Sequence, residues 1–228
     1  MTEPQPRVPY QEASRLLLRE SILDAVHDFL LERDWSGVTM TDVAAAVGVS
    51  RQTLYNEFGS RQGLANGYAL RLVDRFVDAV TDAVYRHEGD ARAALVDGFT
   101  GFFQASGADP LVRSLRTGAA KPDLLRIVTT DSAPLIERAT GRLAETFRLS
   151  WIQASEGDST VLGHGIVRIA LSYVSMPPTS DRDDAQELAA LLAPFVDVVT
   201  RRRHVPSPGA DRHPIAWEST QTANRRGT

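Results

Sequence analysis

The stretch VTMTDVAAAVGVSRQTLYNEFGSRQGL, residues 38–64, decides the fold of this chain. Its first part predicts a short helix over about residues 40–47, because Thr39 followed three residues later by Asp42 is an acidic relative of the capping box. Gly48 then supplies the left-handed turn residue that ends this helix, since glycine adopts a positive φ without steric cost.

A second short helix is predicted over about residues 51–57, because Ser50 is a favourable N-cap and Gly59 follows as a terminating glycine. Alanines at positions 44–46 allow the two helices to approach each other closely. Two short helices joined by a tight glycine turn form a helix-turn-helix, whose second helix enters the major groove and reads bases with its N-terminal residues.

The N-terminal residues of this second helix have side chains suited to base edges. Arg51 can take guanine O6 and N7 with two hydrogen bonds, and Gln52 can do the same with adenine N6 and N7. The methyl group of Thr53 can contact the methyl group of thymine. We therefore expect these three residues to face the groove.

Outward from this stretch the helical period dominates, and no convincing strand-type alternation interrupts it, so we expect an all-α fold. One helix is expected over about residues 11–33 and a long one from Ser60 to about His87. A break at 88–90 follows. Further helices are expected over 91–105, 109–118, 122–130, 133–154, 159–176 and 183–202.

The same pattern gives a domain organisation. We expect a flexible N-terminal segment over residues 1–10, a helix-turn-helix domain over 11–60, and a helical effector-binding and dimerisation domain over 61–204. The helix over 61–87 connects the last two. The segment 205–228 is polar and rich in Pro, Gly, Ser and Thr, which predicts a disordered tail.

The opening stretch resembles the DNA-binding signature of the TetR (tetracycline repressor) family. The shared features are a Thr before the first short helix, Val-Ala at its middle, Gly-Val-Ser at the turn, Thr-Leu-Tyr and then Phe, and a basic residue ahead of the Leu that opens the long helix. The resemblance covers about residues 18–68. Two departures are an arginine where the family usually has lysine, and Gly59-Ser60-Arg61 where it usually has a small residue or proline and lysine.

The resemblance implies a repressor, or another transcriptional regulator, that binds palindromic operator DNA as a homodimer. It also assigns roles to individual positions. Phosphate contacts are implied for Thr39, Thr41, Tyr55 and Arg61. Groove-facing positions are implied for Arg51, Gln52, Thr53 and Asn56, and Ser50 completes the expected DNA-binding set.

The charge of the chain constrains this interpretation. The net charge is −4, which argues against a surface coated for non-specific nucleic-acid binding. Residues 1–70 contain nine acidic residues and six arginines. DNA binding therefore requires the basic groups to gather on one face while the acids point elsewhere.

The last two predicted helices suit a dimer interface. The helix over 159–176 is apolar on most of its circumference, and the helix over 183–202 carries an apolar stripe, so both can be buried against the protomer's own core and against a partner. The resemblance implies a four-helix bundle between two subunits. The interface positions we expect are Ile166, Ile169, Tyr173, Leu188, Leu191, Phe195 and Val199.

The middle helices carry many large apolar side chains, which form a core in the simplest interpretation. The resemblance implies a cavity among them, and the residues expected to line it are Phe99, Phe102, Phe103, Leu111, Leu115, Ile127, Trp151 and His164. Polar candidates for orienting a ligand are Gln104, Thr129, Gln153 and His164. Such a lining favours a hydrophobic effector, for example a lipid or a fatty-acyl-like molecule. The resemblance implies that the effector acts by shifting the long helix, through different affinities for the two positions.

Other classes of function find little support in the sequence. There is no cysteine, the histidines have no metal-ligand spacing, and no hydrolase, zinc-protease, P-loop or dinucleotide motif is present, so we expect no enzyme, no cofactor and no metal site. No apolar run approaches the roughly 18 residues of a membrane span, and a cytoplasmic protein with no membrane partner is expected. Two alternatives stay open: a helical interaction or scaffold protein whose helix-turn-helix is only structural, and an activator without a small-molecule ligand.

Overall fold

The computed structural model describes residues 10–116, 122–176 and 183–202, and every regular element in these ranges is helical. The predicted all-α fold is confirmed. The elements are α1 (Tyr10–Glu32), the 3-10 helix η1 (Trp35–Gly37), α2 (Met40–Val47), α3 (Arg51–Phe58), α4 (Arg61–Arg86), α5 (Ala91–Ala108), α6 (Pro110–Arg116), α7 (Pro122–Val128), α8 (Ala133–Leu149), α9 (Glu156–Ser175) and α10 (Asp184–Arg202).

The helix ends follow local capping chemistry. The hydroxyl of Thr39 accepts a hydrogen bond from the Asp42 backbone N–H (3.2 Å), and the Asp42 carboxylate accepts one from the Thr39 N–H (3.4 Å), which completes the predicted capping box. Gly48 ends α2 with a φ of 74°. These boundaries are the ones that the sequence predicts.

The boundary between α8 and α9 differs from the prediction. The helix expected over 133–154 ends at Leu149, and α9 begins at Glu156 rather than at residue 159. Ser155 sets the new start, because its hydroxyl accepts a hydrogen bond from the Asp158 N–H at 3.1 Å. The connection between the two helices contains Gln153 with a φ of 45°. Trp151 therefore lies in a loop and not on a helix.

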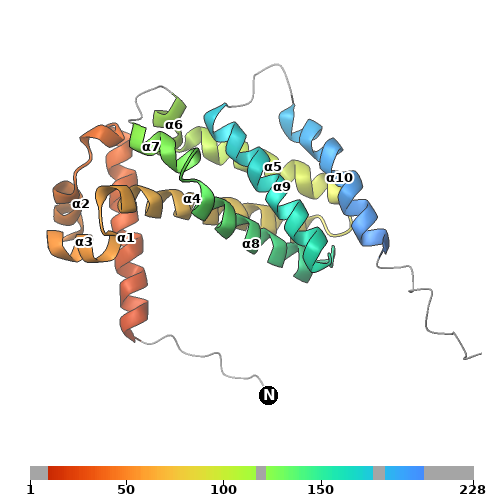
Figure 1. Cartoon of the computed structure of the whole chain (residues 1–228), viewed down its shortest axis with the longest axis horizontal. Coiled ribbons are helices and arrows are strands. Elements are labelled where there is room, and N and C mark those ends of the chain that lie inside the picture. The colour runs from red at the N-terminus through yellow and green to blue at the C-terminus, as the bar shows by residue number, and fades with distance from the viewer. Residues whose placement is uncertain (1–9, 117–121, 177–182, 203–228) are drawn as a thin grey trace, which may run out of the picture.

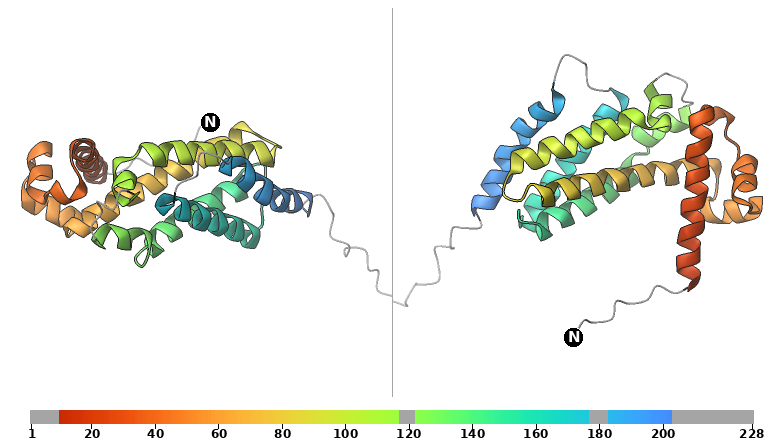
Figure 2. Two further views of the ribbon diagram at one scale, coloured as in Figure 1. Left: turned by 90° about the horizontal axis from the view of Figure 1, so that it is seen from above. Right: turned by 180° about the vertical axis from the view of Figure 1, so that it is seen from behind.

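The helices form two groups joined by α4. In Figure 1, α1, α2 and α3 cluster at one end, and α4 leaves this group and runs along the molecule. The views in Figure 2 agree with this arrangement. Helices α5 and α8 pack on α4, α9 packs on α8, and α10 packs on α5.

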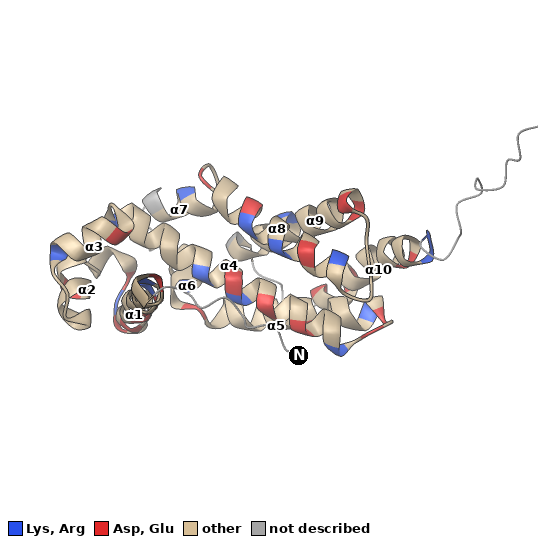
Figure 3. Cartoon of the chain, turned by 90° about the horizontal axis from the view of Figure 1, so that it is seen from below, with Lys and Arg blue, Asp and Glu red and all other residues tan. Residues whose placement is uncertain are grey.

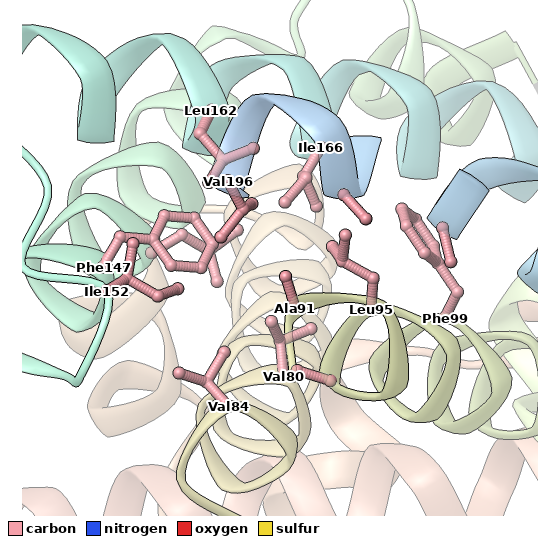
Figure 4. Close-up of a cluster of buried hydrophobic side chains, with 14 of the residues drawn as sticks. Val80, Val84, Ala91, Leu95, Phe99, Phe147, Ile152, Leu162, Ile166 and Val196 are labelled. Carbon is pink, nitrogen blue, oxygen red and sulfur yellow. The ribbon is translucent and has the colours of Figure 1, made fainter. Parts of the chain in front are cut away.

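Two hydrophobic clusters correspond to the two groups. One lies where α4, α5, α8, α9 and α10 meet, and Figure 4 shows Val80, Phe147, Leu162 and Val196 converging there. The other contains the core of α1–α4 and continues into α6, α7 and the start of α8 through Leu111, Leu124, Ile127 and Leu135. The core of α1, α2, α3 and the start of α4, the end of the molecule expected to bind DNA and called the DNA-binding end below, is thus packed directly against the short helices α6 and α7.

The flexible N-terminal segment and the disordered tail expected from the sequence concern residues that the structure does not describe. The segment 1–10, apart from Tyr10 at the start of α1, and the tail 205–228 lie outside the described residues. Across the described ranges no helix is both long and apolar enough to cross a membrane.

Candidate DNA-binding site and effector cavity

Helix α3 has one buried side and one exposed side. Leu54 and Phe58 are buried against the core of the DNA-binding end. The side chains on the opposite side are exposed, and they are those of Arg51, Gln52, Tyr55 and Asn56. Each belongs to the set expected to contact DNA, so the helix presents the predicted residues to solvent while its apolar side anchors it.

Hydrogen bonds order the polar side of α3 before any DNA is bound. Ser50 caps the helix by accepting from the Thr53 N–H at 3.0 Å, and its hydroxyl also lies 2.8 Å from the Thr53 hydroxyl. One turn further, the Gln52 amide donates to the Asn56 side-chain oxygen at 2.8 Å. These contacts restrict the rotamers of three expected base-reading residues, which lowers the entropy lost on binding.

Glycines in α4 allow that helix to pass close to the end of α3. A Cβ at Gly63 would lie 1.9 Å from the carbonyl oxygen of Phe58, and a Cβ at Gly67 would lie 2.7 Å from the Phe58 ring. The guanidinium of Arg19 covers the same ring at 4.4 Å. Phe58 is therefore packed between α1 and α4, and this packing fixes the position of α3.

Arg61 is engaged inside the DNA-binding end. Its guanidinium donates to the carbonyl of Val38 at 3.1 Å and to the carbonyl of Trp35, and it stacks on the Trp35 ring at 4.4 Å. The side chain ties the first turn of α4 to the segment before α2. The expected phosphate contact of Arg61 stays a prediction, and the structure adds an internal role that the sequence did not indicate.

The charges near α3 are arranged so that the acids do not face outward beside the base-reading residues. Glu57 turns toward α1 and is paired with Arg15 at 2.9 Å and with Arg19 at 3.3 Å. Asp42 caps α2 and lies 3.4 Å from Arg33. Figure 3 shows basic and acidic segments interspersed along the ribbon instead of gathered at this end.

The requirement stated from the sequence is thus met only in part. Glu57 and Asp42 are paired with arginines, but the basic groups do not gather on one face, because Arg15, Arg19 and Arg33 are engaged in these ion pairs. The structure describes the whole of α3, and Arg51 is the single basic residue of that helix.

A cavity of about 430 Å³ lies between the two groups of helices. Its walls come from α1, α4, α5, α6, α7, α8 and α9. The space exists because many lining positions on α4 and α5 are small: they are Ala69, Ala79, Gly101, Ala105 and Ala108. A Cβ at Gly101 would meet no atom within 4 Å, so helix α5 leaves open a space that larger residues would fill.

Half of the residues that the sequence assigned to the cavity line it. Phe102, Leu111, Leu115 and Ile127 do so. Phe99 and Trp151 lie instead in the hydrophobic cluster where α4, α5, α8, α9 and α10 meet. There the Trp151 indole N–H donates to the carbonyl of Val84 at 2.7 Å.

The other two members of that assigned set also lie elsewhere. Phe103 packs on Tyr173 with ring centroids 5.0 Å apart, and His164 is exposed on α9. Phe99, Phe103, Trp151 and His164 are therefore removed from the candidate cavity residues, because their side chains pack against other parts of the protomer or face solvent.

The polar groups of the cavity are not those suggested by the sequence. Gln104, Thr129 and Gln153 are exposed and do not line it. The polar lining residues are His27, Arg75, Ser106 and Asp109. Sequence analysis missed the contribution of α1 altogether, and it also missed the small residues of 101–108, although that glycine- and alanine-rich run was a visible signal for open space.

The predicted dimer residues divide into two kinds. Ile166 and Val199 are buried in the protomer's own core, with 1% and 6% of their surface exposed, and are removed from the candidate interface because little of them is left for a partner. Ile169, Tyr173, Leu188 and Phe195 are half-buried and Leu191 is 68% exposed. Two further apolar residues of these helices are exposed although they were not among the seven expected interface positions: Val161 on α9 and Val198 on α10.

Within residues 10–116, 122–176 and 183–202, no group of three or more His, Asp or Glu side chains is arranged to hold a metal ion.

Comparison with known families assigns the chain to a class. Residues 22–67 match the family of bacterial regulatory proteins called the tetR family, and residues 90–194 match the bacterial tetracyclin repressor C-terminal domain. The chain belongs to the TetR family of bacterial transcriptional regulators, whose members bind operator DNA and dimerise. It is therefore a DNA-binding transcriptional regulator, and the resemblance stated from the helix-turn-helix stretch is confirmed.

Individual relatives narrow the comparison. The chain is 58% identical over 194 residues to the HTH-type transcriptional regulator AlkX of Mycobacterium tuberculosis. The matched region covers 85% of this chain and 92% of that protein. The crystal structure of the TetR family repressor AlkX from Dietzia sp. strain DQ12-45-1b, implicated in biodegradation of n-alkanes, is 44% identical with a TM-score of 0.73, covering 78% and 97% of the two chains. A tetR-family regulator from Streptomyces coelicolor, 17% identical over 84% and 93% of the chains with a TM-score of 0.52, shares the fold.

Proposed function

We propose that this regulator is a repressor that binds a palindromic operator as a dimer and releases it when an apolar, chain-like molecule occupies the cavity. The observation that carries the proposal is the lining of the 430 Å³ cavity: among the described residues that form it, only His27, Arg75, Ser106 and Asp109 are polar. A site of this composition favours long hydrocarbon or fatty-acyl-like chains over sugars or nucleotides. The relative from Dietzia is a repressor implicated in n-alkane biodegradation, which supports the same class of effector.

Chain length provides the energy for such an effector. Each buried methylene contributes about 0.8 kcal/mol, so a chain of about ten methylenes contributes about 8 kcal/mol before the cost of association. That cost is roughly 4–15 kcal/mol, so short chains are expected to bind weakly and long ones to bind well. Affinity that rises with chain length is the signature of this function.

The DNA roles proposed for the helix-turn-helix keep the predicted residues. Arg51, Gln52, Thr53 and Asn56 are proposed to face the groove, and Thr39, Thr41, Ser50, Tyr55 and Arg61 to stand near the phosphates. A TetR-type dimer reads two half-sites, so α9 and α10 are proposed as the interface. The interface set becomes Val161, Ile169, Tyr173, Leu188, Leu191, Phe195 and Val198. A regulator of chromosomal operators acts in the cytoplasm, and that is the proposed location.

The test uses DNA fragments from upstream of the regulator's own gene together with dodecane, 1-dodecanol and dodecanoate and their shorter homologues. We expect tight, salt-dependent binding of the fragment that contains the operator, and release by at least one dodecyl compound but not by its butyl homologue. Gel-shift titration measures release, and calorimetry measures binding of the compound. Binding of no compound of the series, or release that does not depend on chain length, would overturn the proposal.

A matched pair of variants places the effector in the cavity. Gly101→Leu puts a side chain into the open space beside α5, whereas Gly107→Leu adds the same side chain to the same helix at an exposed position that does not line the cavity. We expect Gly101→Leu to weaken binding of the dodecyl compound and leave operator binding intact, and Gly107→Leu to change neither. Equal losses in both variants would show that the compound binds elsewhere.

A further inference from the structure

Helix α1 belongs to the DNA-binding end, yet two of its side chains form part of the cavity wall. His27 and Leu31 line the cavity, while Val26 and Leu30 of the same helix are buried in the core that also holds Leu54 of the recognition helix. One helix therefore touches both the space proposed for the effector and the core that supports α3.

A chain of hydrogen bonds links this helix to Asp109, another residue of the cavity wall. The His27 Nδ1 lies 2.7 Å from the Tyr68 hydroxyl, and that hydroxyl donates to the Asp109 Oδ2 at 3.0 Å. Because the tyrosine proton points to Asp109, the tyrosine oxygen accepts from the Nδ1–H of His27. This series of hydrogen bonds thus runs from α1 through Tyr68 of α4 to Asp109, the residue that precedes α6.

Burial makes these hydrogen bonds consequential. Tyr68 is completely buried and Asp109 is 7% exposed. Burial, and then the neighbouring Asp109 carboxylate, raise the pKa of Tyr68 far above its ordinary value, so the hydroxyl keeps its proton and stays a donor. A buried carboxylate is tolerated only where it is hydrogen-bonded, so loss of the tyrosine contact is costly.

Asp109 also holds the start of α6. Its Oδ1 accepts from the backbone N–H groups of Leu111 at 2.8 Å and Val112 at 3.2 Å, and the side chains of both residues line the cavity. A molecule pressing on α6 therefore displaces the carboxylate that Tyr68 needs. A shift of about 1 Å is enough to break a hydrogen bond of 3.0 Å, since these bonds fail beyond about 3.5 Å.

A second link makes α1 and α4 move together. Arg71 of α4 is 6% exposed and donates to the Asp24 carboxylate at 2.6 Å and to the Leu23 carbonyl at 2.7 Å, both on α1. Its guanidinium also stacks on the Tyr68 ring at 5.0 Å. Arg71 thus holds α1 and α4 together. Within the series of hydrogen bonds from His27 to Asp109, the bond from the Tyr68 hydroxyl to Asp109 is the one that joins these two helices to the start of α6.

We propose that His27, Tyr68 and Asp109 form the coupling contact through which the DNA-binding end responds to occupation of the cavity. The three are positioning residues: they transmit the position of α6 to α1 and α4. An effector changes operator affinity only if it favours one arrangement of these helices over another, and the hydrogen-bond chain can close in only one of them. The inference rests on the proposed function, because it requires a molecule that binds in the cavity and releases DNA.

The test compares full-length variants that each lose one interhelical hydroxyl. Tyr68→Phe keeps the ring and removes the link to His27 and Asp109. Thr81→Val removes a comparable hydroxyl contact between α4 and α8, the 2.9 Å hydrogen bond with Thr146, in a residue that does not line the cavity. For each, operator affinity is measured with and without saturating dodecane, 1-dodecanol and dodecanoate, and binding of each compound is measured by calorimetry.

In the wild type the expected coupling factor is about 5- to 150-fold. We expect Tyr68→Phe to bind the compound but to lose about threefold to tenfold of this factor, the effect of about one hydrogen bond. Thr81→Val should keep the wild-type factor. His27 also lines the cavity, so His27→Phe is compared only by its coupling factor at saturating compound, and this factor should fall by a similar amount. The double variant should lose no more of the factor than either single variant, because a hydrogen-bond chain broken at one link has no second link to lose.

The negative results of this test differ in what they refute. If no compound binds the wild type, the proposed function falls and this inference falls with it. If a compound binds and releases DNA equally well from the wild type and from Tyr68→Phe, only the coupling role of the hydrogen-bond chain is refuted. A coupling loss equal in Tyr68→Phe and Thr81→Val would also refute it, because the effect would then follow from weakened helix packing in general.

Discussion

Glycines do opposite work at the two ends of this molecule. At the DNA-binding end, Gly63 and Gly67 allow α4 to approach Phe58 so closely that a Cβ would collide with it. On the cavity wall, Gly101 faces space in which a Cβ would meet nothing within 4 Å. The same residue type permits close helix packing at one end and leaves open space at the other.

The difference reflects what each end must do. Base readout depends on hydrogen bonds that tolerate only a few tenths of an ångström, so α3 has to stand in a fixed place. Under the proposed function the cavity has to admit a molecule, so its walls need open space in place of close contacts. Substitutions at these glycines are therefore expected to differ in sign as well as in size.

The largest effect is expected for Gly63→Ala. Its Cβ would lie 1.9 Å from a backbone oxygen of Phe58, which cannot move away as the end of a flexible side chain can. Overpacking of this kind costs about 3 kcal/mol or more, so the variant should unfold earlier in urea and lose operator binding. Gly107→Ala, on an exposed turn of α5, is the control. A Gly63→Ala protein with wild-type stability would mean that α3 and α4 are not held in this close contact.

The next effect tests whether both ends must be joined across a two-fold axis. Leu191→Glu places a carboxylate on the exposed apolar residue of α10, where a partner would bury it at a cost of several kcal/mol. We expect a folded monomer with weakened operator binding and an untouched recognition helix. Light scattering and gel-shift titration on one sample measure both. A dimer that persists would place Leu191 outside the interface, and a monomer with full operator affinity would contradict the two-half-site reading of DNA.

A smaller effect is expected within the recognition helix. Gln52→Ala removes the amide that is held by Asn56 on the exposed side of α3, and we expect a loss of about 1–3 kcal/mol on the operator with relaxed specificity at one base pair. Binding to random DNA should change little. The measurement is a titration of the operator and its single-base variants. Equal losses on all sequences would assign Gln52 to the backbone and not to a base.

The smallest effect is expected at the cavity glycine and has the opposite sign to that of Gly63→Ala. Gly101→Ala adds a methyl group in open space within a helix, and it should stabilise the fold by about 0.5–1 kcal/mol because alanine loses less conformational entropy on folding. Thermal unfolding checks the sign. Destabilisation by this substitution would show that the space beside α5 is closed in solution.

How far the sequence could predict these features depends on the range of the interactions. The caps at Thr39, Gly48 and Ser50 were predictable, because each is decided by residues within three positions of it. Phe99 and Phe102 could not be told apart, since they lie three residues apart on α5, and only the placement of distant helices sends one to the packed core and the other to the cavity. The internal bonds of Arg61 are equally non-local, because its partners lie 23 and 26 residues away.

The length of α4 has a mechanical consequence. The helix has 26 residues, so at 1.5 Å per residue it is about 39 Å long. Its first turn is fastened by Arg61 to the segment before α2, and its second half lies under α5 and α8. A tilt of about 5° pivoting at one end of a rod of that length displaces the other end by about 3 Å. That is about the length of a hydrogen bond, so under the proposed function a small rotation at the cavity would be amplified into a movement that takes a recognition helix out of register with its bases.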